Sequence, residues 1–322
     1  MLMNLIMYFH SVIEYYPDEV QRQSTVVLSK KELQYYVDIL SKDYEFATIT
    51  ESCRRRSKRP QCILTFDDGH KNNATVVYPF LRSRGIPFTI YLSTNFVNSG
   101  NIMWHPRLMY WLLNLKPNTS FTVNRHKMTA EGDGISERLQ QFTQLARIVN
   151  EYKLVSNQFD ELLDLTQIIA EFCFENSPEC LETYGPMSWD DVKALAKDPD
   201  VDIQSHSHHH FQHGLASKES VAKSVEESIR MLSSKIGHEP HHFCYPGGSF
   251  NRTSTEIVRG MGFLSATTCI PFHWYRYNDM MLLPRLSGHL KDPDAIRAYT
   301  RFKVSSLAKG ALKIGRQYWM MQ

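Results

Sequence analysis

The sequence predicts an α/β fold in which βα units build a parallel sheet or barrel. Short apolar runs alternate with stretches of helical periodicity, an order typical of such units. The chain has 322 residues, 42% of them hydrophobic, which is enough for one large core. The alternation breaks between residues 101 and about 185, and this indicates an insertion within a single domain.

The apolar runs predict buried strands at residues 4–8, 62–66, 87–92, 201–204, 242–245 and 264–268. Between them, Ser29 and Glu32 have the spacing of a capping box and open a helix through Leu40. Ser188 and Asp191 mark a second helix start in the same way. A third helix is predicted up to Gly237, because apolar residues recur at helical spacing along one face: Val221, Val225, Ile229, Leu232 and Ile236.

The insertion at 101–185 contains successive helical patterns and no clear strand, so we expect a helical lid or subdomain. It follows the strand that ends near Leu92. The carboxyl end of a barrel strand faces the active site, and the insertion is therefore expected to border that site.

Composition narrows the class of protein. The net charge is +2, which gives no electrostatic reason to expect a nucleic-acid partner. Six scattered cysteines without a CxxC pair fit a reducing compartment. The N-terminal segment lacks a basic n-region, and there is no apolar run of about 18 residues. These features predict a cytoplasmic protein.

Two adjacent carboxylates, Asp67 and Asp68, come directly after an apolar strand, and Gly69 allows a sharp turn behind them. Adjacent carboxylates repel each other, so a bound cation is the natural way to keep both ionised. One carboxylate would then bind the metal and the other would be free to act as a base. The alternative is an ordinary Asp-Asp-Gly surface turn.

A histidine cluster follows another apolar run, with His206 and His210 four residues apart. Zinc accepts imidazole and carboxylate together, and three protein ligands leave one position open for water. The alternative is a solvated histidine-rich loop that binds metal adventitiously.

The segments TFDDG at 65–69 and HSxxH at 206–210 resemble the first two motifs of the polysaccharide deacetylases, the NodB-like carbohydrate esterases of family 4. The resemblance covers residues 1–100 and about 186–290. It implies a distorted (β/α) barrel of about seven strands and hydrolysis of an acetyl group from an acetylated saccharide. By residue, it implies that Asp67 is the base, while Asp68, His206 and His210 hold one divalent metal. That metal is expected to be zinc, with cobalt, nickel or iron as alternatives.

The third motif region, Phe243 to Gly248, places Cys244 where many family members have an arginine. This pattern resembles the poly-N-acetylglucosamine deacetylase branch, which implies that Arg285 in a Leu-Pro-Arg stretch orients the base. A surface salt bridge is the alternative for Arg285. Tyr245 and Gly247 are expected to contact substrate, with the Gly247 N–H available to an oxyanion.

The resemblance to this branch also implies a permuted barrel, in which the acid histidine follows the first strand. His10 is then the candidate general acid, although a lone histidine beside an aromatic is also typical of a packed core. His289 is the competitor, because the acid histidine of unpermuted relatives lies near the C-terminus.

The expected organisation is a deacetylase barrel over 1–100 and 186–296, the insertion over 101–185, and a basic tail over 297–322. Trp104 and His105 are candidate sugar contacts, and the alternative for Trp104 is a place in the core of the insertion. The tail has six basic residues and no acid, and its apolar and aromatic groups suit peripheral contact with a membrane surface. The alternative is a final barrel helix that buries its apolar side and leaves its lysines in solvent.

The expected function is metal-dependent removal of acetyl groups from an N-acetylated, or O-acetylated, sugar of a polysaccharide, oligosaccharide or lipid-linked glycan. Three rivals stay open. The first is an amide or imide hydrolase acting on a non-sugar substrate, and the second is a non-catalytic sugar-binding relative. The third is a non-haem iron oxygenase, whose two histidines and one carboxylate usually lie on a β jelly roll.

Overall fold

The computed structural model describes residues 4–17, 19–54, 57–103, 105–106, 109, 112–113, 115–123, 126–130, 132, 134–155, 178–271, 274, 279–292 and 297–298. Trp104 and nearly all of the basic tail lie outside these residues.

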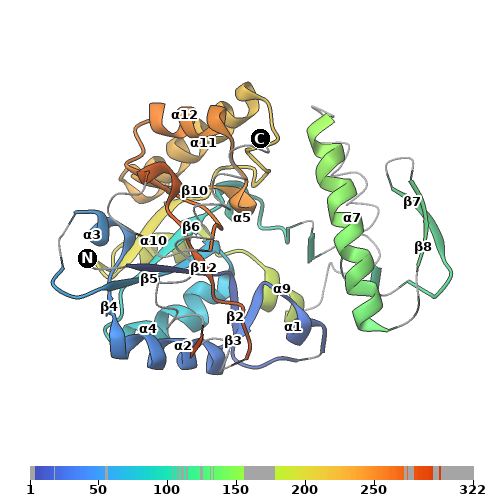
Figure 1. Ribbon diagram of the computed structural model, residues 1–322, viewed down its shortest axis with the longest axis horizontal. Coiled ribbons are helices and arrows are strands. Elements are labelled where there is room, and N and C mark those ends of the chain that lie inside the picture. The colour runs from blue at the N-terminus through green and yellow to red at the C-terminus, as the bar shows by residue number, and fades with distance from the viewer. Residues whose placement is uncertain are drawn as a thin grey trace.

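A parallel sheet forms the centre of the molecule (Figure 1). Seven strands follow one another in the order β11-β10-β9-β6-β5-β1-β12, and β4 also pairs with the start of β5. Every pairing among these strands is parallel. The strands are β1 (Leu5–Phe9), β4 (Glu45–Phe46), β5 (Gln61–Asp68), β6 (Phe88–Leu92), β9 (Val201–Ser205), β10 (His242–Cys244), β11 (Ser265–Thr267) and β12 (Leu286–Ser287).

The segment 283–287 closes the sheet into a distorted barrel. On one side β12 pairs with β1. On the other side the Leu283 N–H donates to the Ala266 carbonyl at 2.8 Å, and the Thr268 N–H donates to the Leu283 carbonyl at 2.9 Å. The predicted α/β barrel of about seven strands is therefore confirmed.

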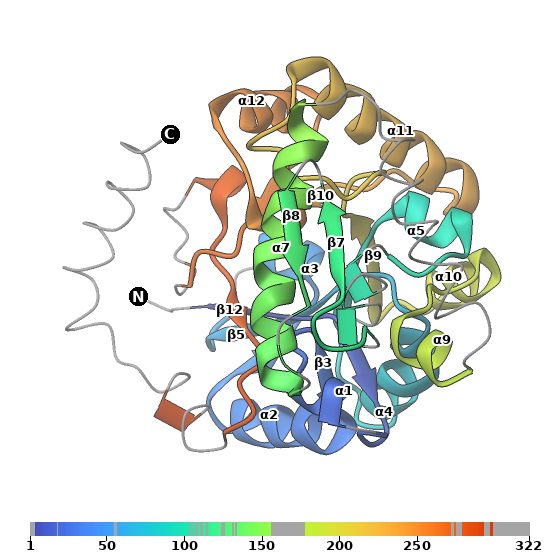
Figure 2. The ribbon, with the colours of Figure 1, turned by 90° about the vertical axis from the view of Figure 1, so that its right-hand side faces the viewer.

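Helices cover the outside of the barrel (Figures 1 and 2). They are α1 (Glu19–Gln23), α2 (Lys30–Asp43), α3 (Ile49–Arg54), α4 (Tyr78–Arg82), α5 (Thr94–Ser99), α9 (Pro178–Tyr184), α10 (Trp189–Leu195), α11 (Lys218–Ile236) and α12 (Arg252–Gly260), while α7 (Ile135–Val155) belongs to the insertion. Single turns at Asn73–Val77, Pro246–Gly248 and Met280–Leu282 and a short parallel pair, β2 (Ser11–Ile13) with β3 (Val27–Ser29), complete this part of the fold.

Successive side chains along each barrel strand point to opposite faces of the sheet, so one part of the core lies between the sheet and the helices and another lies inside the barrel. Met7, Phe9 and Phe66 pack outward against the helices, in a cluster that includes Leu33 and Tyr36 of α2. Side chains of the other parity point into the barrel, where Ile6 and Ile63 form an apolar cluster with Ile49, Trp274 and Leu283.

The predicted strands all occur, with ends shifted by up to two residues, and so do the three predicted helices. Ser29 and Ser188 each accept a hydrogen bond in a capping box, at the starts of α2 and α10. Gly237 ends α11 in the left-handed conformation, at φ 82°. Such a conformation is open to glycine at little cost.

The expectation of an insertion without strands is wrong. Besides the long helix α7, it contains an antiparallel hairpin of β7 (Ser120–Val123) and β8 (His126–Thr129). These strands are four residues long and mix polar with apolar residues, so their sequence lacks the apolar run that marks the barrel strands. The hairpin and α7 stand beside the barrel in Figure 1 and in front of it in Figure 2. No described helix is both long and apolar enough to cross a membrane.

Candidate active site

Strand register brings the predicted site residues together at one end of the barrel. Asp68 at the end of β5 pairs with Leu92 of β6, which in turn pairs with Ser205 at the end of β9. His206 follows Ser205 directly, so it emerges at the same height as Asp68. The carboxyl ends of parallel strands are where such barrels place their functional groups.

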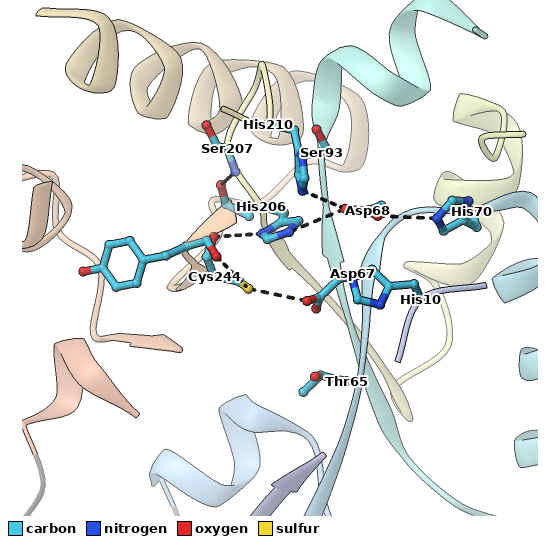
Figure 3. A network of polar contacts seen from close by, with 12 residues as sticks. His10, Thr65, Asp67, Asp68, His70, Ser93, His206, Ser207, His210 and Cys244 are labelled. Atoms are coloured by element: carbon cyan, nitrogen blue, oxygen red, sulfur yellow. Dashed lines mark hydrogen bonds and ion pairs between the residues drawn. The ribbon is translucent and has the colours of Figure 1, made fainter. Parts of the chain in front are cut away.

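Asp68, His206 and His210 form a group with the donor set of a divalent metal site (Figure 3). The Asp68 Oδ1 lies 3.1 Å from the His210 Nε2 and 3.5 Å from the His206 Nε2. Among the described residues, neither Asp68 Oδ1 nor His210 Nε2 has a hydrogen-bond partner, although both are buried. Buried polar atoms are normally satisfied, so atoms that converge without bonding to each other fit a shared cation.

Several residues at or beside this group have a strained backbone conformation with positive φ. Asp68, Ser207 and His210 have positive φ angles of 74°, 67° and 51°, and Gly69 has 95°. Non-glycine residues adopt this conformation rarely, and such outliers cluster at functional sites. A Cβ on Gly69 would also overlap the Leu92 side chain, so the turn after the two carboxylates requires glycine.

His206 is held by a second contact behind the group. Its Nδ1 lies 2.8 Å from the Cys244 carbonyl oxygen and therefore donates its proton there, which leaves Nε2 as the ligand atom. Burial lowers the pKa of His206 to about 4, so the ring is neutral at pH 7, the form that binds metal.

Asp67 is clamped by a buried arginine. The Arg285 Nη1 donates to Asp67 Oδ1 at 2.7 Å and Nη2 to Oδ2 at 2.8 Å. Both residues are almost fully buried, which rules out the alternative of a surface salt bridge. Burial by itself would raise the pKa of Asp67, but the charge and hydrogen bonds of Arg285 together with the nearby His206 outweigh it, and the pKa lies below its usual range.

Cys244 lies near Asp67, with its Sγ 3.8 Å from Oδ2, so Asp67, His206 and Cys244 also come within ligand distance of one another. This trio fits a metal poorly. Asp67 already pairs both of its oxygens with Arg285.

The structure places both candidate acid histidines side by side. Extending the β1–β12 register by two residues sets His10 opposite His289, and the His10 Nδ1 lies 2.9 Å from the His289 Nε2. His10 lines the cavity described next, whereas His289 does not. Burial lowers the pKa of both rings.

A cavity of about 500 Å³ opens over these groups and is lined by Tyr8, His10, Asp67, Asp68, His206 and His210. The insertion supplies its opposite wall through Met103, His105, Pro106, Met109, Leu139 and Phe142. His105, a candidate sugar contact, lies with its ring centroid 5.9 Å from that of His210. The volume is typical of a small-molecule site.

Tyr245 is not where it was expected. Its side chain is fully buried in a core cluster, with Phe243 and Phe250 as ring neighbours at 5.4 Å and 5.5 Å, and it does not line the cavity. The expectation of a Tyr245 side-chain contact with substrate is therefore wrong. Gly247, two residues on, does line the cavity, with φ 59°. Trp104 lies outside the described residues.

His70 is a site residue that the sequence reasoning missed. Its Nε2 lies 3.4 Å from the Asp68 Oδ2, the oxygen that does not face His206 and His210, and its ring lines the cavity. Its position directly after the Asp-Asp-Gly turn could have identified it from the sequence. Its residue type could not, because the chain contains many other histidines.

The family model for polysaccharide deacetylase matches residues 54–138 and 142–266, and the chain belongs to this family. Comparison with curated proteins finds no match. Among solved structures it is similar to a Streptococcus pyogenes deacetylase, PplD, in complex with acetate, with 13% identity, 89% of this chain and 92% of that chain covered, and a TM-score of 0.58.

Two further solved structures share the fold. IcaB from Ammonifex degensii has 15% identity, with 93% of this chain and 97% of that chain covered, and a TM-score of 0.56. The BpsB deacetylase domain from Bordetella bronchiseptica has 13% identity, with 89% and 96% covered, and a TM-score of 0.53. The parallel barrel is also unlike the jelly roll expected of an iron oxygenase. Membership in the family supports carbohydrate deacetylase activity on an acetylated polysaccharide.

Proposed function

We propose that this protein is a metal-dependent hydrolase that removes acetyl groups from an N-acetylated sugar of a polysaccharide, oligosaccharide or lipid-linked glycan. The observation that carries the proposal is that the two adjacent carboxylates have different partners. Asp68 converges with two histidines on a cation position, whereas Asp67 is turned to a guanidinium and kept ionised.

Asp68, His206 and His210 would hold the ion. When bound there, a divalent metal supplies Lewis acidity to the acetyl carbonyl and to the attacking water. Zinc suits this donor set, with cobalt, nickel or iron as other candidates.

Asp67 is proposed to take the proton of the attacking water. Its lowered pKa keeps it ionised at neutral pH, and the bidentate contact with Arg285 fixes the carboxylate plane. The Gly247 N–H at the cavity wall is the proposed donor to the oxyanion that develops on the carbonyl.

His10 is proposed to protonate the leaving amine. An amine leaves poorly as an anion, so an amide substrate depends on this proton more than an ester does. Because the His10 Nδ1 faces His289, a proton on that nitrogen leaves Nε2 to exchange protons in the cavity. The contact supports His10 as the acid and His289 as a residue that positions it.

The direct test is acetate release from a panel of N-acetylated and O-acetylated oligosaccharides, with and without a chelator. We expect release from at least one N-acetylated saccharide, its loss on chelation and its recovery on adding zinc or cobalt. Turnover of cyclic imides without acetate release would instead favour the imide hydrolase. Saccharide binding without any turnover would identify a non-catalytic relative.

A further inference from the structure

A second group of metal-ligand type lies on the outer side of the loop that carries His206 and His210. It consists of His208 and His209 from the loop and Glu227 from α11, whose ligand atoms all lie within 4.8 Å of one another. None of the three lines the catalytic cavity, and the group shares no residue with the Asp68 site.

The distances within this group are too long for hydrogen bonds and suit a shared ion. A single carboxylate oxygen, Glu227 Oε2, lies 3.6 Å from the His208 Nε2 and 3.4 Å from the His209 Nε2. Hydrogen bonds between nitrogen and oxygen measure roughly 2.7–3.2 Å. Neighbouring ligands of a tetrahedral zinc ion, each bound at about 2.0–2.2 Å, lie roughly 3.4 Å apart.

His208 is oriented as metal-binding histidines usually are. Its Nδ1 lies 2.7 Å from the Thr94 hydroxyl at the start of α5, so Nε2 is the nitrogen presented to Glu227. A partner on the second ring nitrogen fixes the ring and its tautomer, which is the usual outer-shell arrangement of a histidine ligand.

The backbone of the loop is fastened to the helix that supplies the carboxylate. The Ser224 hydroxyl, one turn before Glu227 on α11, accepts from the N–H groups of His208 and His209 at 3.3 Å and 3.1 Å. On the other side, the Asn95 N–H donates to the His208 carbonyl at 3.0 Å. The backbone that carries the two histidines is therefore held in place by contacts that do not involve a metal.

The surroundings leave room for the rest of a coordination shell. The His208 side chain is 10% exposed, His209 is 31% exposed and Glu227 is 26% exposed. An ion can therefore enter from solvent and keep a water in the position that three protein ligands leave open.

We propose that His208, His209 and Glu227 bind a second divalent ion of the zinc class, which ties the ligand loop to α11. The loop carries Ser207 and His210 in strained left-handed conformations, and the second ion would help to hold them. This bracing role rests on the proposed function of His206 and His210 as ligands, whereas the second site itself does not.

The test is metal analysis of the full-length protein after loading with zinc and dialysis against metal-free buffer. We expect two zinc ions per chain in the wild type and one in Glu227→Gln and in His209→Ala. The matched control is Glu226→Gln, an exposed neighbour on the same helix, which should keep two. His210→Ala should leave one ion, and His210→Ala combined with Glu227→Gln should leave none.

The proposal is overturned if the wild type retains a single zinc ion after dialysis, or if Glu227→Gln and His209→Ala both retain two. Circular dichroism establishes that each variant is folded before its metal is counted. Because acetate release is not the readout, a protein that holds two zinc ions without deacetylating any saccharide would refute the proposed function and leave the second site standing.

Discussion

Arg285 is the residue on which the proposed base depends most. Replacing it by lysine keeps a positive charge but removes the bidentate contact with Asp67. We expect kcat/KM to fall roughly 10- to 100-fold, the equivalent of one hydrogen bond to a charged group. Since Arg285 lowers the pKa of Asp67, its loss raises that pKa, and the acid limb of the pH–rate profile should move to higher pH.

The control for this variant is Arg259→Lys, which changes an exposed ion pair with Asp279 and should leave both the rate and the profile unchanged. An acid limb that stays in place in Arg285→Lys would argue that Asp67 is not the base.

The roles of His10 and His289 can be distinguished by substitutions that keep or remove single parts of their contact. His10→Asn retains a donor near the position of Nδ1 and removes Nε2, so N-deacetylation should fall about 10²- to 10⁴-fold, with a smaller loss for O-acetyl substrates. His289→Leu should lose less, and His289→Gln should recover part of that loss by accepting from His10. A wild-type rate of N-deacetylation in His10→Asn would end the assignment of His10 as the acid.

At the scale of elements, the end of the closing strand β12 packs so closely against β1 that the next residue, Gly288, has no room for a side chain. The Gly288 N–H donates to the Tyr8 carbonyl at 2.8 Å, and a Cβ on Gly288 would overlap the buried Phe9 ring. We expect Gly288→Ala to lower the free energy of unfolding by about 1–3 kcal/mol, the usual cost of overpacking, as measured by urea denaturation. Gly260→Ala, where a Cβ meets nothing within 4 Å, should be neutral or slightly stabilising.

The insertion contributes binding surface to the proposed cavity through α7. Phe142 lines the cavity, so Phe142→Ala should raise KM for an acetylated oligosaccharide several-fold and leave kcat nearly unchanged, because it removes contacts made equally in the ground and transition states. Gln140→Ala, at an exposed position on the same helix, is the control. Equal KM values for both variants and the wild type would place the substrate away from the insertion.

At the scale of the whole molecule, we propose that the basic tail at 297–322 brings the enzyme to anionic membrane surfaces. It has six basic residues and no acidic one, and each basic residue near an anionic leaflet contributes about 1 kcal/mol. The full-length protein should sediment with anionic liposomes and much less with neutral ones, whereas a chain ending near Tyr299 should sediment with neither. Negligible pelleting of the full-length protein with both lipids would end this idea.

Much of the barrel and of the proposed metal site could be predicted from the sequence, because both depend on short-range patterns. Apolar runs locate the strands, capping residues locate the helix starts, and the two carboxylates and two histidines each sit within five residues of a strand end. Nearness along the chain is then enough to bring such groups to the same edge of a parallel sheet.

The tertiary structure alone decided which distant residues meet. Arg285 reaches Asp67 across 218 residues, and His10 meets His289 across 279, because the closing strand has one particular register against β1. The same packing turned Tyr245 into the core and set Glu227 against His208 and His209. Register between distant strands and the rotation of a helix over its sheet are fixed by burial of the whole core, and this is why no local pattern specifies them.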